Sequence, residues 1–583
     1  MLALAACTGA PDEPRGVYLH AASDFDLQTW DPALAYDETA LEVLPAIFET
    51  LFQYDYLAEN PRLKPLLAAG NPTTSRDRKI LEIPILSGVR YHADPCFGRE
   101  DGKGRELVAS DFVFALKRLA MPSLHSPGWW LLGRRIEGMR ELRAELEKLP
   151  PGARWKHLED ADVAGLQAPT EQRLRIRFEK PFFQVVHLLA QTFTAPLAPE
   201  CARAKADVAG AVFSPPIGTG PFRLKEWVRG GRIVLERNPD RRPEYYPTDG
   251  SSEFRTRGWL ADAGKPLPLV DGLIFEIFPD KAPAWASFLK GRVDALRIPK
   301  DQVTHAITNE ANLSPELESR GARLSIEPGS SFSFLLFNMR DPIVGKNKLL
   351  RQAISSAIDR GKWIELFAAG RASKMTSLWP PGLPEGRKTG AIKYDFDLAR
   401  ARALMKRAGY PGGKGLPPLG LELRGSDGYN RQLGEFLSRQ LAQVGVQLHP
   451  MPHDFGPFLH SVRSGKFQLA SGNWEMDYPD PLNVAELLYG ANAAPGPNLA
   501  SFNDARVNSL YEKLPGSAAE LDAIVQEEVP WVYGFHYAHY TVTQPWVRNF
   551  RAHGLTHGHG MLVNKWKYVR VDGEAKARYL EGQ

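Results

Sequence analysis

The segment that most constrains the fold is residues 218–240, whose pattern predicts a β-hairpin. A turn between Gly218 and Pro221 precedes alternating apolar and polar residues, and Gly230 and Gly231 then reverse the chain into a second apolar strand. A dinucleotide-binding loop needs a further glycine and a helix at this point, where the chain continues with Pro221 and a strand. The segment therefore indicates a sheet and argues against a dinucleotide-binding loop.

The remaining chain mixes strand and helix patterns, with no strict alternation and no internal repeat. The expected strands include residues 173–179 and 273–278, and the expected helices include residues 39–52, 110–120, 347–367, 397–408 and 431–444. A chain of 583 residues also exceeds what one compact core usually holds, so two or more lobes are expected. Together these features predict an α/β fold with mixed sheets.

The charge of the chain is nearly balanced, since 72 basic and 68 acidic residues give a net charge of +4. So small an excess, spread along the chain, provides no electrostatic footprint for nucleic acid, and no nucleic-acid partner is expected. A bilayer span needs about 18 to 20 consecutive apolar residues, and no run in the sequence is that long.

Signatures of catalysis and of metal binding are scarce. The sequence contains no metalloprotease, serine-hydrolase or phosphate-binding-loop motif and no paired CxxC. His553, His557 and His559, together with His536 and His539, are the best candidates for a metal site. Because no cysteine and few carboxylates accompany them, a Gly-rich loop is the preferred interpretation, and no metal or cofactor is expected. A secreted hydrolase with an unrecognised site stays open as an alternative.

The first residues resemble the end of a bacterial lipoprotein signal. Leu4 and two alanines precede Cys7, as in a lipobox, and a polar run with Pro and Gly follows. A full signal would begin with Lys or Arg and carry a longer hydrophobic stretch, so residues 1–16 are interpreted as a signal remnant and tether. Lipid anchoring through Cys7 outside the cytoplasm is expected, and the alternative is an apolar terminus without that role.

Cys96 and Cys201 are the two cysteines that remain. An exported location permits them to pair, although three cysteines in the whole chain is sparse usage. Nothing in the sequence shows that their geometry allows a bridge. Two free or weakly structural thiols are therefore expected, and pairing is the alternative.

Residues 474–481 form the strongest candidate for ligand recognition. Asp477 lies between Trp474 and Tyr478, in a turn where Pro479 and Pro481 forbid a regular continuation. A carboxylate flanked by aromatic rings suits an ammonium group, which it binds through an ion pair and contact with the ring faces. The alternative interpretation is a solvated aspartate that caps a turn.

Residues 218–240 also resemble a known protein family. Further segments that match the same family, in the same order, occur along nearly the whole chain. Residues 218–240 resemble the signature of the family 5 extracellular solute-binding proteins, which are the oligopeptide-, dipeptide- and nickel-binding components of ABC importers. The supporting segments are residues 30–36, 48–51, 106–118, 289–294, 337–338, 350–360, 474–481 and 530–537. No single match is specific, but their common order makes chance an inadequate explanation.

The resemblance implies a two-lobed periplasmic binding protein of the cluster C type, with an extra subdomain in the larger lobe. Such proteins engulf the ligand as the lobes close about a hinge. The expected division is residues 17–60 and 196–300 for lobe I, residues 61–195 for its extra subdomain, residues 301–531 for lobe II and residues 532–583 for the return to lobe I.

The resemblance also implies where a peptide ligand binds. Asp477 matches the aspartate that anchors the ligand's ammonium group in peptide-binding members. The other expected site residues are Trp474 and Tyr478 beside that group, Asn473, Glu475, Met476, Tyr36 and Asp37 along the peptide backbone, and Arg424 and Arg431 as a carboxylate clamp. The alternative within the same fold is a non-peptide ligand such as a metal chelate, sugar, opine or lipid-like molecule.

The implied partners are a peptide ligand and an ABC permease and ATPase complex in the membrane. The implied location is the periplasm or the outer cell surface, and a monomer without enzymatic activity is expected.

Overall fold

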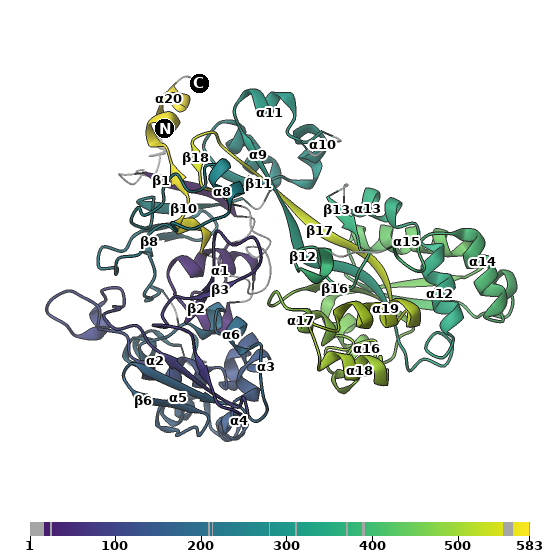
Figure 1. The fold of residues 1–583 in the computed structure, drawn as a ribbon, viewed down its shortest axis with the longest axis horizontal. Coiled ribbons are helices and arrows are strands. Elements are labelled where there is room, and N and C mark those ends of the chain that lie inside the picture. The colour runs from purple at the N-terminus through teal and green to yellow at the C-terminus, as the bar shows by residue number, and fades with distance from the viewer. Residues whose placement is uncertain are drawn as a thin grey trace, which may run out of the picture.

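The computed structural model describes residues 17–23, 26–35, 37–207, 210–212, 214–278, 280–308, 312–368, 371–387, 391–551 and 564–581. The chain forms two lobes that the long strands β12 (Arg323–Phe337) and β17 (Trp531–Thr543) connect (Figure 1). In Figure 1 the first lobe lies on the left, in purple, blue, teal and yellow, and the second lies on the right, from teal-green to yellow-green. Within the described ranges, no helix is both long and apolar enough to cross a bilayer.

One mixed sheet runs through both lobes and, in the described part of the chain, has eleven strands. Their order is β15-β14-β16-β12-β17-β11-β1-β10-β9-β8, and β13 pairs with β17 outside this path. The sheet contains parallel pairs, such as β1 with β10, and antiparallel pairs, such as β12 with β16. This arrangement confirms the predicted α/β fold with mixed sheets.

The two connecting strands pair with each other from one lobe to the other. Arg323 of β12 opposes Thr543 of β17 in the first lobe, and Leu336 opposes Trp531 in the second. The register shifts between Pro328 and Phe332, in the middle of the connection. A register shift of this kind locally disrupts the ladder of hydrogen bonds, which leaves the middle of the connection less constrained than its ends.

The first lobe contains its end of the large sheet, two separate two-stranded sheets (β2 with β3 and β18 with β19) and the helices around them. Its strands are β1 (Tyr18–Ser23), β2 (Phe52–Tyr54), β3 (Leu63–Pro65), β8 (Phe222–Val228), β9 (Arg232–Arg237), β10 (Gly272–Ile277), β11 (Ala295–Arg297), β18 (Val547–Arg548) and β19 (Arg570–Val571). Its helices are α1 (Glu38–Val43), α8 (Ser252–Thr256), α9 (Lys281–Leu289), α10 (Val303–Ala306), α11 (Pro315–Ser319) and α20 (Gly573–Glu581).

A smaller unit within the first lobe has a sheet of its own, with the strand order β4-β5-β7-β6. Its strands are β4 (Thr73–Thr74), β5 (Ile80–Pro84), β6 (Leu166–Thr170) and β7 (Arg173–Arg177). Its helices are α2 (Ala109–Arg118), α3 (Pro127–Leu131), α4 (Met139–Lys148), α5 (Pro151–Asp160), α6 (Val185–Leu188) and α7 (Pro199–Lys205). In Figure 1 this unit occupies the lower left, and α3 and α6 lie on its side toward the second lobe.

The second lobe packs helices against its end of the sheet. Its further strands are β13 (Ala372–Lys374), β14 (Leu419–Arg424), β15 (Leu448–His453) and β16 (Leu469–Glu475). Its helices are α12 (Lys348–Ala357), α13 (Arg360–Ala368), α14 (Leu398–Arg407), α15 (Gly428–Ala442), α16 (Phe455–Ser464), α17 (Pro481–Ala485), α18 (Ala505–Tyr511) and α19 (Ala518–Glu528). Side chains of α12 to α15 and of the sheet form one apolar core. The lobe boundaries predicted from the sequence stay predictions.

The predicted hairpin at residues 218–240 is confirmed as β8 and β9. Gly230 has a φ of 69° at its turn, a conformation that glycine adopts without steric cost. Gly218 is required for a different reason, because a Cβ atom there would lie 2.0 Å from the carbonyl oxygen of Ile47. Buried His92 accepts a hydrogen bond from the Gly218 amide at its Nδ1 (3.3 Å) and donates from its Nε2 to the Gly220 carbonyl (3.2 Å).

The stability of this junction is expected to depend on pH. Burial lowers the pKa of His92 from 6.5 to about 4, so between these values the unfolded chain binds one proton that the folded chain excludes. The free energy of unfolding should therefore fall as the pH decreases from 6.5 to 4, by up to about 1.4 kcal/mol per pH unit from this group. Denaturant titrations at several pH values check this, since His92→Asn should show a shallower dependence than the wild-type chain. Equal slopes in the two proteins would contradict this account.

Two predicted helices were wrong in extent. The expected helix at residues 39–52 ends early, because α1 gives way to a short turn at Leu44–Ala46 and then to β2. The expected helix at residues 347–367 divides into α12 and α13 at Ile358, whose backbone is extended. The buried Arg360 guanidinium donates to the carbonyls of Ser355, Ile358 and Tyr533 there, and these tertiary contacts outweigh the helical pattern.

The expectation of two free thiols was also wrong. Cys96 and Cys201 form a disulfide across a sequence separation of 105 residues. Cys96 lies in a short helical turn, Pro95–Phe97, and Cys201 lies in α7. The fold brings these two segments together with a Cα–Cα distance of 5.1 Å, which the sequence spacing alone does not reveal.

Candidate functional site

A pocket of about 450 Å³ lies between the two lobes. Trp130 of α3 and Arg134 of the following turn contribute its wall from the first lobe. Residues of β12, β14, β16 and α16, and of the loop at residues 495–500, contribute its wall from the second lobe. The ring of Phe334 stacks on that of Trp531, with centroids 4.1 Å apart, so the pocket has a rigid aromatic surface.

Three of the residues predicted from the sequence line this pocket, namely Arg424, Asn473 and Trp474. Arg424 ends β14, and Asn473 and Trp474 lie in the neighbouring strand β16. The two strands are parallel, with Leu421 opposite Leu469, so both run toward the same edge of the sheet. The side chain of Asn473 is exposed, and that of Trp474 is half-buried.

Asp477 follows β16 and is buried, with 1% of its surface exposed. Asn483 of α17 holds this turn in place through three hydrogen bonds. Its Oδ1 accepts from the Asp477 amide (2.9 Å) and from Trp474 Nε1 (3.2 Å), and its Nδ2 donates to Asp477 Oδ2 (3.0 Å). The sequence interpretation missed Asn483, whose only local signal was the helix start that Asp480 and Pro481 mark.

The first lobe contacts this same turn. Gln191 donates from its Nε2 to the main-chain carbonyl of Asp477 (2.7 Å), and Arg135 pairs with Glu486 at 3.5 Å. The ring of His187 stacks on that of Tyr478, with centroids 5.8 Å apart. Burial lowers the pKa of His187 to about 4, so its imidazole is neutral near pH 7. The candidate anchor therefore lies at the junction of the two lobes, and none of these first-lobe residues was predicted.

The neighbours of Asp477 are less accessible than the sequence suggested. Tyr478 and Met476 are buried, with 2% and 1% of their surfaces exposed. The amide of Met476 donates to the Ser330 carbonyl at 3.3 Å, which continues the pairing of β16 with β12. Glu475 is half-buried and lies opposite Ser331 in that ladder.

The structure places the remaining predicted residues elsewhere. Arg431 lies on the exposed surface of α15 and donates to the Ser426 carbonyl at 3.0 Å, outside the lining of the pocket. Asp37 is half-buried and caps α1 by accepting from the Ala40 amide. Tyr36 and Cys7 lie outside the described residues, as do His553, His557 and His559.

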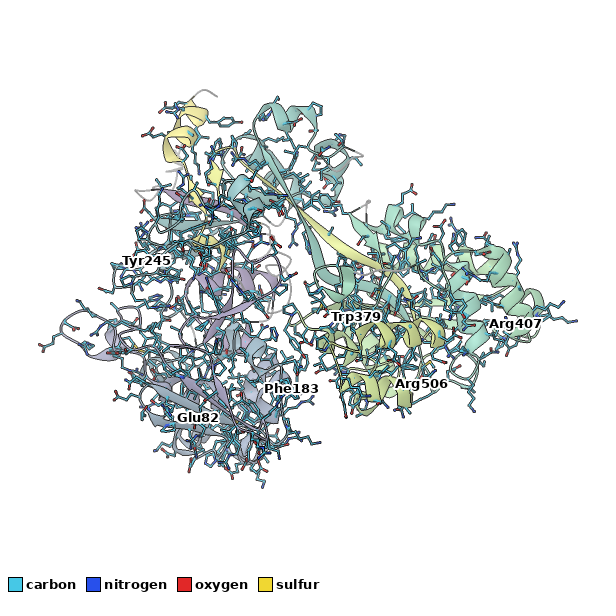
Figure 2. All side chains as sticks on the ribbon, in the orientation of Figure 1. Glu82, Phe183, Tyr245, Trp379, Arg407 and Arg506 are labelled. Carbon is cyan, nitrogen blue, oxygen red and sulfur yellow. A yellow bond between two sulfur atoms is a disulfide. The ribbon has the colours of Figure 1, made fainter. Side chains whose placement is uncertain are left out.

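Two further residues bear on what the site can bind. His536, one of the metal candidates, is buried in β17, and burial lowers its pKa to about 3. Across the described ranges, no group of three His, Cys, Asp or Glu side chains could hold a metal ion. On the edge of the first lobe that faces the second, the ring of Phe183 is 60% exposed (Figure 2). The space between the lobes thus combines aromatic surface with a few polar groups, as ligand pockets commonly do.

Comparison of the sequence with known proteins gives one family model and several relatives. A family model described as the bacterial extracellular solute-binding proteins, family 5 Middle, matches residues 62–496. The dipeptide-binding protein of Escherichia coli is 25% identical over 72% of this chain and 69% of its own length. Heme-binding protein A of Haemophilus influenzae is 22% identical over 80% of this chain and 78% of its own length.

The fold has close counterparts among solved structures. The ABC transporter-associated periplasmic binding protein DppA of Helicobacter pylori, solved in complex with the peptide STSA, superposes with a TM-score of 0.65. The match covers 95% of this chain and 98% of that protein, at 20% sequence identity. The two-lobed fold expected from the sequence is therefore confirmed.

Proposed function

The chain belongs to the family 5 bacterial extracellular solute-binding proteins, and from this premise we propose that it captures short peptides between its two lobes. The family is made up of transport solute-binding proteins rather than enzymes, so the chain's task is to bind and release its ligand unchanged. Delivery to an ABC permease and ATPase complex in the membrane is part of the proposal.

The observation that carries the proposal is the position of Asp477. Its carboxylate is buried at the junction of the lobes, in the same turn as Trp474 and Tyr478. Asn483 donates a hydrogen bond to this carboxylate. A free peptide amino terminus supplies the charged hydrogen-bond donor that a carboxylate binds most strongly. The aromatic rings nearby add a favourable surface for an ammonium group.

The peptide backbone needs hydrogen-bonding partners as well. We expect the main chain of Asn473, Glu475 and Met476 to provide them in the second lobe, and that of Tyr36 and Asp37 in the first. An extended peptide held in this way behaves as an added strand. Its main-chain hydrogen bonds then provide affinity that does not depend on the identity of its side chains.

The proposed location is the periplasm or the outer cell surface, with Cys7 as the point of lipid attachment. The disulfide between Cys96 and Cys201 supports an exported location, because such bonds persist in oxidising compartments.

A thermal-shift experiment tests the proposal against non-peptide ligands. A tripeptide pool at about a hundred times its dissociation constant should stabilise the folded chain by about 2.7 kcal/mol. Hemin, glutathione and an opine serve as comparison ligands. Chromatography of the peptides after prolonged incubation should show them unchanged. Stabilisation by one comparison ligand alone would contradict the peptide assignment, and cleavage of the peptides would contradict the assignment as a binding protein.

A further inference from the structure

The lining of the interlobe pocket carries positive charge. Three of its residues are arginines, Arg134 from the first lobe and Arg424 and Arg463 from the second, and none of its lining residues is aspartate or glutamate. Arg424 ends β14, and Arg463 lies in the last turn of α16. The two lobes therefore bring three guanidinium groups to one cavity whose lining contains no carboxylate.

Two of these guanidinium groups have no directly bonded carboxylate in the described part of the chain. Arg134 and Arg463 make neither an ion pair nor a side-chain hydrogen bond there. The pKa of Arg134 is lowered, first by burial and then by the positive charges of Arg135 and Arg140, and the carboxylate of Glu486, which pairs with Arg135, opposes this shift only in part. A bound anion would relieve this repulsion, because an opposite charge close by favours the charged form of the guanidinium group.

The rest of the pocket is apolar and largely aromatic. Phe334, Phe458 and Trp531 are buried, with 6%, 5% and 3% of their surfaces exposed, and Trp130 and Trp474 are half-buried. Such a surface binds a large apolar side chain through the hydrophobic effect and ring contacts. A ligand that fits both features carries a bulky apolar group close to a carboxylate.

We propose that this pocket selects peptides that end in a large apolar residue, whose side chain packs on the aromatic wall and whose terminal carboxylate binds the arginines. This inference rests on the proposed function and narrows it, since it assigns the preferred carboxy-terminal residue. It also assigns roles in specificity to Arg134 and Arg463, which no sequence pattern indicated.

The spacing of the site agrees with a very short peptide. Trp474 lines the pocket and Asp477 lies three residues further along the chain, a separation of at most about 10 Å for extended backbone. Two or three extended peptide residues span about 7 to 10 Å. A di- or tripeptide therefore reaches from the proposed ammonium anchor to the pocket.

Calorimetric titration with three tripeptides tests the inference. Ala-Ala-Phe should bind most tightly, and its carboxy-terminal amide at least about tenfold more weakly, because a hydrogen bond to a charged group is lost. Ala-Ala-Ala should also bind at least about tenfold more weakly, because the aromatic wall loses its apolar partner.

Two variants test the arginines. Arg463→Met and Arg134→Met keep the apolar stem and remove the charge. Each variant should bind Ala-Ala-Phe about tenfold more weakly than the wild-type chain does, and its affinity for the peptide amide should be unchanged.

Arg407→Met is the matched control, because Arg407 lies on the exposed surface of α14 at the far edge of the second lobe (Figure 2). It should leave all three affinities unchanged. Equal binding of Ala-Ala-Phe and its amide, with no effect of the two pocket variants, would overturn the assignment of the pocket and leave peptide capture intact. If none of the three tripeptides binds, the proposed function itself fails.

Discussion

Asp477→Asn is expected to weaken tripeptide binding by about thirtyfold or more while the chain stays folded. The substitution preserves the shape of the side chain and an oxygen for Asn483 Nδ2, but it removes the charge that pairs with the ligand's ammonium group. Truncating one partner of a buried, hydrogen-bonded charge pair costs about 2 kcal/mol or more, which corresponds to that factor. Calorimetric titration of Ala-Ala-Phe into the two proteins measures the difference.

Asp480→Asn provides the control from the same turn. Asp480 Oδ1 accepts from the Leu482 amide at the start of α17 (2.8 Å), and asparagine caps helices as well as aspartate does. This variant should retain the wild-type affinity. If Asp477→Asn also retains it, Asp477 does not bind the ammonium group.

Asp31→Ala should lower the free energy of unfolding by about 3 to 5 kcal/mol. Asp31 and Arg118 are fully buried, and they form two hydrogen bonds of 3.1 and 2.6 Å that join the amino-terminal segment to α2. Asp31 also accepts from the Val212 amide at 2.9 Å. Without its carboxylate, the Arg118 guanidinium stays buried and unneutralised, which carries a penalty of this size. Denaturant titration checks the effect, and the adjacent buried Trp30 offers a fluorescent probe.

Two further variants make this expectation specific. The exposed pair of Glu435 and Arg439 on α15 has a separation of 3.3 Å, and Glu435→Ala should leave stability unchanged because exposed pairs contribute little. The double variant Asp31→Asn with Arg118→Met should recover part of the lost stability, because no buried charge is then left unpaired. Equal effects of Asp31→Ala and Glu435→Ala would contradict the importance of burial.

The sequence was most informative where the deciding interactions are local. The hairpin of β8 and β9 follows from alternating residues and glycines at a turn, which depend on neighbours a few positions apart. Arg424, Asn473 and Trp474 were named from the family resemblance, and the structure brings them to one pocket because β14 and β16 are adjacent parallel strands.

The sequence was least informative where distant segments meet. The contact of Gln191 with the Asp477 carbonyl spans 286 positions and involves a main-chain atom that any residue type provides. The break between α12 and α13 depends on Arg360 contacts to Tyr533, which no helical pattern contains. The bond between Cys96 and Cys201 likewise depends on how α7 packs. Such features follow from the assembled fold, so local patterns do not reveal them.

Native mass spectrometry of the chain as purified from its source tests peptide capture most directly. A binding protein whose lobes enclose its ligand retains part of it through purification, and the bound mass identifies the chemical class. We expect a heterogeneous set of short peptides, released on unfolding and enriched in large apolar residues at the carboxy terminus. A single non-peptide mass bound in stoichiometric amount would contradict the proposed function.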